Sequence, residues 1–327
     1  MAIGKASDFV VYQDQVRGAI VERLTQASNF FNGAGGGLRM STISRRGDYY
    51  QESFFKNIAN LTGRRDTTDV TAATDLALTM DEMISVKLNR GVGPVAQTYD
   101  AFKKVQLASG DEALSFLIGT QVAKAMEVDM LNTSLRCGVA ALNNQSSVKH
   151  TVAAGGTIAT ADLVTGLSKM GDQSAAISTW VMHSKVFFDL VQYQLNPTNS
   201  GDNIAQTTLQ AAGPATLGRQ VIVTDSEALF DDSGTNTEYF TLGLRPGGLM
   251  VENSEEETIV SETVTGLKNL VVRMQGEYAF NAGVSGFKWD TANGGSNPTD
   301  AALATGSNWD PAATSFKDYA GVIIQSR

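Results

Sequence analysis

The longest regular pattern of hydrophobic and polar positions covers residues 111–142. Its apolar side chains recur almost always three or four positions apart, as they do on one face of an α-helix. They are Leu114, Leu117, Ile118, Val122, Ala125, Val128, Leu131, Leu135, Val139 and Leu142. Ser109 is a suitable N-cap, and the acidic Asp111 and Glu112 suit a helix N-terminus. The pattern predicts one helix of about 32 residues, roughly 48 Å long, without the sustained heptad register of a coiled coil.

The chain before this helix contains a second helical pattern, a glycine-rich hinge and a strand. Apolar residues three and four positions apart predict a helix over residues 16–31. Gly33, Gly35, Gly36 and Gly37 follow it and predict a hinge, since no Lys-Ser/Thr of a phosphate-binding P-loop comes after them. Residues 83–89 alternate apolar and polar side chains, which predicts a half-buried strand closed by Gly91 and Gly93-Pro94.

The chain after the long helix alternates between helices and strands and then becomes rich in strands. We expect helices at residues 161–170, capped by Thr160, and 185–193, with strands at residues 177–182, 220–224, 238–244 and 320–325. Residues 245–248 predict a turn, and residues 251–280 are β-rich. The acidic cluster at residues 252–257 is expected at a solvated strand edge, because it lacks the loop spacing of an EF-hand calcium site. Together these elements predict an α+β fold.

A basic, aromatic-rich arm at residues 38–66 is the strongest candidate for binding a partner. Basic residues interleaved with aromatic ones occur in nucleic-acid sites, but the overall acidity of the chain favours a protein partner. Aromatic side chains dominate the energetics of protein interfaces. The candidate inter-subunit contacts are Arg45, Arg46, Tyr49, Tyr50, Phe54 and Phe55.

The composition is that of a globular protein and argues against several other classes of protein. The 327 residues include 42% hydrophobic and 18% charged residues, as in an ordinary globular protein, and the net charge of −9 argues against a nucleic-acid reader. An acidic inner wall would still suit a container for DNA, because like charges do not adhere. No apolar run approaches the roughly 20 residues that span a bilayer, and the run near Val10 is too short for a signal peptide. The single cysteine, Cys137, is expected to be buried and fits a reducing cytoplasm.

The sequence predicts no catalytic, cofactor-binding or metal-binding residues. His150 and His183 are the two histidines, and neither belongs to the His/Cys cluster that zinc requires. His183-Ser184 lacks the Gly-x-Ser-x-Gly elbow of a hydrolase, so Ser184 is expected to cap a helix that follows a strand. We therefore do not expect an enzyme.

The order of these elements resembles the major capsid proteins of tailed bacteriophages, with the fold named for the Hong Kong ninety-seven phage. The long helix resembles the spine helix of that fold, and residues 217–225 (LGRQVIVTD) resemble its leucine-glycine, strand and aspartate passage. Asn308-Trp309-Asp310 and residues 317–322 (KDYAGV) resemble the C-terminal end of one subgroup. The resemblance implies an N-terminal arm (residues 1–37), an extended loop (38–95), a peripheral domain (96–150 and 245–290) and an axial domain (151–244 and 291–327).

The resemblance also implies a function. The expected product is an icosahedral shell of pentamers and hexamers of this chain, assembled in the host cytoplasm, that encloses double-stranded DNA and contacts it without sequence specificity. The implied partners are a portal protein, decoration proteins and either a separate scaffolding protein or no scaffold, and the virion capsid is the implied location. Two alternatives stay open: an encapsulin-like nanocompartment that holds protein cargo, and an enzyme with an α/β catalytic domain.

Overall fold

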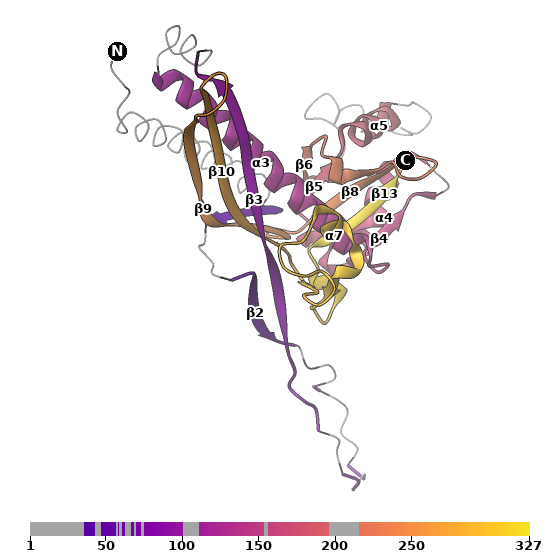
Figure 1. The fold of residues 1–327 in the computed structure, drawn as a ribbon. Helices are drawn as coiled ribbons and strands as arrows, with labels where there is room; N and C mark the ends of the chain where they lie inside the picture. The colour runs from indigo at the N-terminus through magenta and orange to yellow at the C-terminus, as the bar shows by residue number, and fades with distance from the viewer. Residues whose placement is uncertain are drawn as a thin grey trace.

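Two β-sheets lie on either side of one long helix, and a two-stranded hairpin projects away from them (Figure 1). The computed structural model describes residues 36–42, 47–56, 58, 61–62, 67–68, 70–72, 75–100, 111–153, 156–195 and 216–327. The expected helix at residues 16–31, most of the expected N-terminal arm, and Arg45 and Arg46 lie outside these residues.

The long helix, α3, covers Asp111–Asn143, so the predicted helix is confirmed to within one residue at its end. Its 33 residues correspond to about 50 Å. The second half of α3 is buried on almost every side, because it packs between strands of both sheets. Gly138 permits one of these contacts, since a Cβ atom there would lie 2.8 Å from Leu249 Cδ2.

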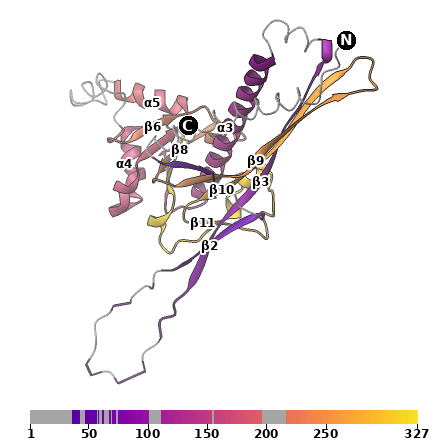
Figure 2. The same ribbon diagram turned by 90° about the vertical axis from the view of Figure 1, so that its left-hand side faces the viewer.

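The first sheet has five strands in the order β1-β9-β10-β3-β2, with β1 parallel to β9 and the other pairs antiparallel. They are β1 (Leu38–Thr42), β2 (Tyr49–Phe55), β3 (Met80–Thr98), β9 (Leu249–Val264) and β10 (Val271–Val284). Figure 2 shows β3 running from the β9–β10 end of this sheet to the projecting hairpin with β2. Ile84, Val86 and Leu88 of β3 are buried, as the alternating pattern predicted.

Two strand predictions in this sheet need correction. The strand predicted at residues 83–89 was expected to end at Gly91 and Gly93-Pro94, but β3 continues to Thr98. A β-bulge in the pairing of β3 with β10 lets the strand pass through these glycine and proline positions. The acidic cluster was expected at a solvated edge, but Glu252 pairs with both β1 and β10. Glu257 is 7% exposed, so the cluster is partly interior to the sheet.

The second sheet has six strands in the order β4-β13-β8-β5-β6, with β7 paired to β8. They are β4 (Lys149–Thr151), β5 (Thr179–Met182), β6 (Gln220–Val223), β7 (Phe230–Asp231), β8 (Glu238–Leu244) and β13 (Gly321–Ser326). Helices α4 (Thr160–Ser168) and α5 (Ser184–Leu195) accompany it, and Trp180, Leu242 and Ile324 are fully buried in its core. All the strands predicted for this part of the chain are confirmed within a few residues.

Both predicted helix caps in this half are wrong. Ala159 is the N-cap residue of α4, and the Asp162 carboxylate accepts its backbone N–H at 2.9 Å, while the Thr160 hydroxyl accepts a bond from Gln194. At α5 the cap is His183, whose Nδ1 accepts the Lys185 backbone N–H at 3.1 Å. The imidazole of His183 therefore accepts a backbone N–H at the start of α5, the role that was expected of the Ser184 hydroxyl.

The C-terminal region folds back against α3. It contains β11 (Phe287–Trp289), α7 (Asp300–Ala304) and β12 (Trp309–Pro311), and β11 pairs with β12. The indole rings of Trp289 and Trp309 meet edge-to-face at 5.0 Å. Trp309 Nε1 donates to the Leu303 carbonyl at 3.1 Å, so this motif ties α7 to the strand pair.

Candidate assembly surface

The projecting hairpin of β2 and the first part of β3 carries most of the predicted contact residues. Its register runs from Tyr49 opposite Val86 to Phe55 opposite Met80. Lys56 N–H donates to the Thr79 carbonyl at 2.9 Å and extends the pairing by one step. Figures 1 and 2 both show the chain beyond this point projecting past the two sheets.

The four predicted aromatic residues lie in β2 but do not form one cluster. Successive side chains of a strand point to opposite faces, so Tyr49 and Phe55 share one face and Tyr50 and Phe54 share the other. Tyr49 packs against the hydrophobic core, whereas Phe55 is 62% exposed. Of the four aromatic residues, Phe55 therefore presents the largest free apolar surface to a partner.

The structure adds a set of exposed apolar residues that the sequence interpretation missed. Leu61, Val70, Leu76, Leu78 and Met80 all lie in or beside the projecting segment, and each is at least half exposed. Leu76, Leu78 and Met80 occupy alternate positions. That period-two spacing is the sequence signal for these residues, and it lies outside the aromatic positions that predicted the contacts. We call these five residues and Phe55 the loop apolar surface.

An ion-paired cluster holds the outer end of the β2–β3 pairing, where the projecting loop begins. Asp81 lies 2.6 Å from Lys56 Nζ and 3.2 Å from Lys288 Nζ, so it joins both strands of the hairpin to β11. Burial alone would raise the pKa of Asp81, but the hydrogen bonds and charges of the two lysines outweigh it and lower the pKa to about 2.

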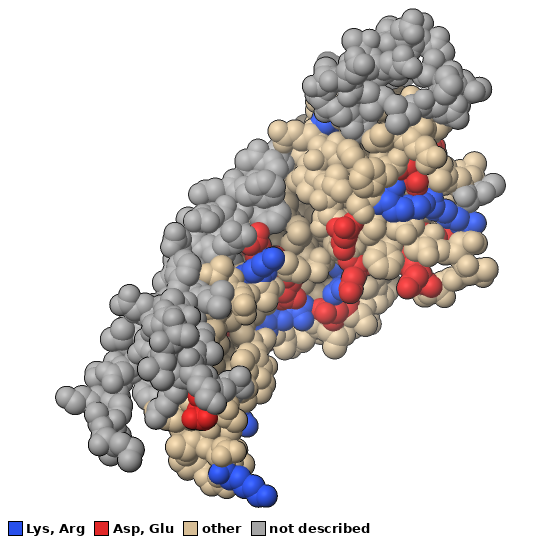
Figure 3. All heavy atoms as spheres, turned by 90° about the horizontal axis from the view of Figure 1, so that it is seen from above, with Lys and Arg blue, Asp and Glu red and all other residues tan. Residues whose placement is uncertain are grey.

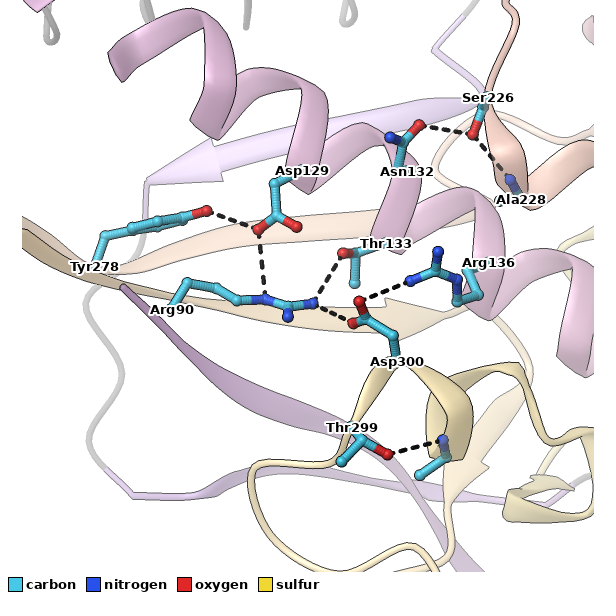
Figure 4. Close-up of polar contacts among 11 residues, drawn as sticks. Arg90, Asp129, Asn132, Thr133, Arg136, Ser226, Ala228, Tyr278, Thr299 and Asp300 are labelled. Carbon is cyan, nitrogen blue, oxygen red and sulfur yellow. Dashed lines mark hydrogen bonds and ion pairs between the residues drawn. The ribbon is translucent and has the colours of Figure 1, made fainter. Parts of the chain in front are cut away.

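A second cluster holds the middle of β3 against α3 and α7 (Figure 4). The Arg90 guanidinium lies 2.6 Å from the Asp300 carboxylate and 3.4 Å from the Asp129 carboxylate. Arg136 reaches the other oxygen of Asp300 at 3.1 Å, and the Tyr278 hydroxyl donates to Asp129 at 2.6 Å. The cluster therefore links β3, β10, α3 and α7, which are distant in sequence.

Electrostatics in this cluster favours the charged state of its ion pairs. Burial would lower the pKa of Arg90, but Asp300 and Asp129 raise it. Burial likewise opposes ionisation of Asp300, yet Arg90 and Arg136 lower its pKa. Burial and the neighbouring Asp129 raise the pKa of Tyr278, so the phenol stays a hydrogen-bond donor.

Cys137, His150 and His183 each have contacts that suit a structural role in the fold. Cys137 is 1% exposed, and burial raises the pKa of its thiol to about 12. His150 Nε2 lies 3.0 Å from Asp162, and His183 caps α5 while its ring contacts Phe230 and Tyr239. Within the described ranges, no group of three or more His, Cys, Asp or Glu could hold a metal ion. Helices long and apolar enough to cross a membrane are absent from the part of the chain that the structure describes.

Charge is mixed on the face of the molecule seen from above (Figure 3). Basic and acidic side chains lie interspersed across its described part, in keeping with a net charge of only −9 over 327 residues. In the described part of the hairpin, several exposed side chains are apolar, and Asp81 forms ion pairs with Lys56 and Lys288 beside them.

Comparison with known proteins decides the family. A family model described as Gp13-like, major capsid protein 13-like, matches residues 8–323. The chain belongs to this family. As a member of the major capsid protein 13-like family, it is a subunit of a bacteriophage capsid shell, and its location is the virion capsid. This membership indicates a structural protein and does not favour the encapsulin-like alternative.

Solved structures share the fold of this capsid protein at low sequence identity. That of Microbacterium phage Oxtober96 has 11% identity and a TM-score of 0.52, covering 88% of each chain. The acidic stable capsid structure of Helicobacter pylori bacteriophage KHP30 has 11% identity and a TM-score of 0.52, covering 91% of each chain. The head structure of Helicobacter pylori bacteriophage KHP40 has 13% identity and a TM-score of 0.50, covering 91% of this chain and 90% of the other. No curated protein matches the sequence. The expected phage capsid fold is confirmed.

Proposed function

We propose that copies of this capsid protein form pentamers and hexamers that close into an icosahedral shell around double-stranded DNA. The loop apolar surface carries the proposal. Its six residues are between 53% and 98% exposed in the single chain, on a hairpin that projects from the body. Large apolar side chains exposed together on one projecting segment indicate an interaction site.

Burial of the loop apolar surface supplies enough free energy to drive assembly, because the same contact is made by every subunit of the shell. Fully burying a leucine or phenylalanine side chain contributes about 1.5–3 kcal/mol, and these side chains are on average more than half exposed. Covering six of them would therefore contribute roughly 5–10 kcal/mol per hairpin before entropic costs. The same contact recurs at every equivalent interface of a closed shell.

The proposed division of the chain follows its sheets. The five-stranded sheet with α3 supports a peripheral domain at residues 96–150 and 245–290, served by an extended loop at 38–95 and an arm at 1–37. The six-stranded sheet supports an axial domain at residues 151–244 and 291–327. Strand β4 (Lys149–Thr151) pairs within the second sheet, so residue 148 is a better proposed boundary than residue 150.

The proposed cargo is DNA held without sequence recognition. A net charge of −9 disfavours tight adhesion between the shell and the phosphate backbone, which leaves packaged DNA able to move. Assembly in the host cytoplasm, with a separate scaffolding protein, a portal protein and decoration proteins, completes the proposal. Arg45 and Arg46 are proposed to contact acidic patches of neighbouring subunits.

Particles purified from cells that express the chain would test this function. They should appear as closed icosahedral shells by negative-stain electron microscopy. Particles from infected cells, treated with nuclease and then disrupted, should release protected double-stranded DNA. Particles that hold a defined protein cargo and no protected DNA would contradict the proposed cargo, and discrete small oligomers would contradict the proposed shell.

A further inference from the structure

A small recess lies on the five-stranded sheet at the root of the projecting hairpin. Its volume is about 50 Å³, and its walls come from β2, β3, β9 and β10. The residues that matter for its chemistry are Tyr50, Glu52, Ser85, Glu252, Asn281 and Gly283. We call it the loop-root recess.

Two buried oxygen atoms in this recess have no hydrogen-bond partner within the described chain. They are Asn281 Oδ1 and Ser85 Oγ, and the Asn281 residue is only 2% exposed. Buried polar atoms are nearly always bonded, because an unsatisfied one loses its hydration without compensation. Lys87 is opposite Asn281 in the sheet, but its ammonium group pairs with Glu255. The ammonium group of Lys87 is therefore already paired within the chain.

The chemistry of the recess matches a cation. Asn281 Oδ1 accepts hydrogen bonds, Ser85 Oγ can accept one, and the carboxylates of Glu52 and Glu252 lie in the same wall. Gly283 keeps the space open, since a Cβ atom there would lie 3.1 Å from Ser85 Cβ. A planar guanidinium group with five N–H donors could satisfy several of these acceptors at once.

We propose that the loop-root recess receives an arginine side chain from a second copy of this chain. This inference rests on the proposed shell assembly. It adds a polar contact between subunits at the recess to the apolar contact at the loop apolar surface. A second copy is the occupant because β2 and β3 form both the recess and the hairpin that carries the loop apolar surface. The shell places such copies side by side, and the acidic wall complements a basic side chain.

Ser85→Ala separates this role from a structural one. Removing an unpartnered hydroxyl should leave the urea midpoint of the isolated subunit unchanged or slightly raised. The same variant should release subunits from assembled shells roughly tenfold faster, which corresponds to about 1.4 kcal/mol for one lost contact. The matched control is Thr241→Val, which removes another buried hydroxyl without a partner, in the six-stranded sheet. Equal release rates for the two variants would overturn the proposal.

Glu52→Gln tests the charge of the recess. Glu52 is exposed in the single chain, so the subunit should fold normally. Shell dissociation should accelerate most at low salt, where a charge contact is least screened. Glu262→Gln, at an exposed position of β9 outside the recess, is the control. A Glu52→Gln effect that matches the control, or that does not depend on salt, would count against an ionic occupant.

A density map of the assembled shell identifies the occupant directly. An arginine of a neighbouring copy within hydrogen-bond distance of Asn281 Oδ1 is the expected result. A recess filled by water or by residues of its own chain would overturn this inference while leaving the shell itself established. If wild-type particles form no shell at all, the proposed function fails instead.

Discussion

Arg90 and Asp300 are 210 residues apart in the sequence, yet their charged groups lie 2.6 Å apart. Arg90 belongs to the strand that continues into the projecting hairpin, and Asp300 begins α7. Because Arg90 also lies near Asp129 on α3, one guanidinium group fixes the hairpin strand to the body of the subunit. The orientation of the hairpin is thus a property of the folded subunit.

Arg90→Met should destabilise the isolated subunit. The change keeps an unbranched apolar stem but removes the guanidinium, so Asp129 loses its cation and Asp300 keeps only Arg136, and we expect a loss of about 1–2 kcal/mol in the free energy of unfolding. Urea denaturation followed by circular dichroism measures it. Lys317→Met is the control, because its partner Asp172 is largely exposed and the pair contributes little. A loss no larger than that of the control would remove the anchoring role of Arg90.

Asp81 should make the subunit sensitive to acid over a defined pH range. Its folded-state pKa of about 2 lies below the unfolded value near 3.8, so its contribution is present above pH 4 and is lost as the pH falls toward 2. Solvent screening at the outer end of the β2–β3 pairing limits the contribution to about 1 kcal/mol or less. Asp81→Asn should be less stable at pH 7 and should lose less stability between pH 4 and pH 2 than the unaltered chain. Parallel pH profiles for the two proteins would contradict this assignment.

Cys137 should be chemically silent in the folded subunit. Its thiol is buried and its pKa is raised to about 12, so the reactive thiolate is scarce at pH 8. Iodoacetamide should label the folded protein negligibly and the urea-unfolded protein completely, as mass spectrometry can measure. Cys137→Ser should still assemble, with a modest loss of stability from the buried hydroxyl. Rapid labelling of native protein would show that the thiol has access to solvent.

Leu78→Asp should block assembly without unfolding the subunit. Leu78 is 60% exposed, so the free chain tolerates a carboxylate there, whereas a dry interface does not. Sedimentation velocity would show soluble subunits that do not form shells. Thr79→Asp places the same charge one residue later, on an exposed residue outside the loop apolar surface, and should have the smaller effect. Equal effects of the two variants would point to charge in general and not to loss of the apolar contact.

Arg45→Glu combined with Arg46→Glu should slow shell closure while leaving the subunit helical. An exposed ion pair contributes about 0–1 kcal/mol, but reversed charges repel acidic neighbours at every interface. The defect should be greatest at low salt, where screening is weakest. Circular dichroism with sedimentation at two ionic strengths measures both properties. Closure at the unaltered rate in low salt would remove the electrostatic role.

The elements with strong local periodicity were predictable from the sequence. The helix at Asp111–Asn143 and the strand at Glu238–Leu244 repeat their apolar positions over their whole length, so pattern and structure agree. Boundaries that depend on distant partners were not predictable. Strand β3 continues past Gly93-Pro94 because β10, about 180 residues later, pairs with it across a bulge. Likewise His183 caps α5 through a ring nitrogen, which residue-type preferences do not anticipate.

The sequence pointed to part of the proposed assembly surface and missed the rest. Basic and aromatic residues predicted contacts in residues 38–66, and of the predicted aromatic residues Phe55 is exposed on the hairpin. Tyr49 packs against the core because strand alternation and pairing with β3 direct it there. The recess at Ser85 and Asn281 joins residues almost 200 positions apart, and such a juxtaposition arises only when the strands pair.

We propose above all that exposed apolar side chains of the projecting hairpin join subunits into a closed shell. A density map of purified particles by electron cryomicroscopy tests it most directly. We predict a closed icosahedral shell in which Leu76, Leu78 and Met80 are buried against a neighbouring copy. A shell in which the same three side chains stay exposed to solvent would contradict the claim.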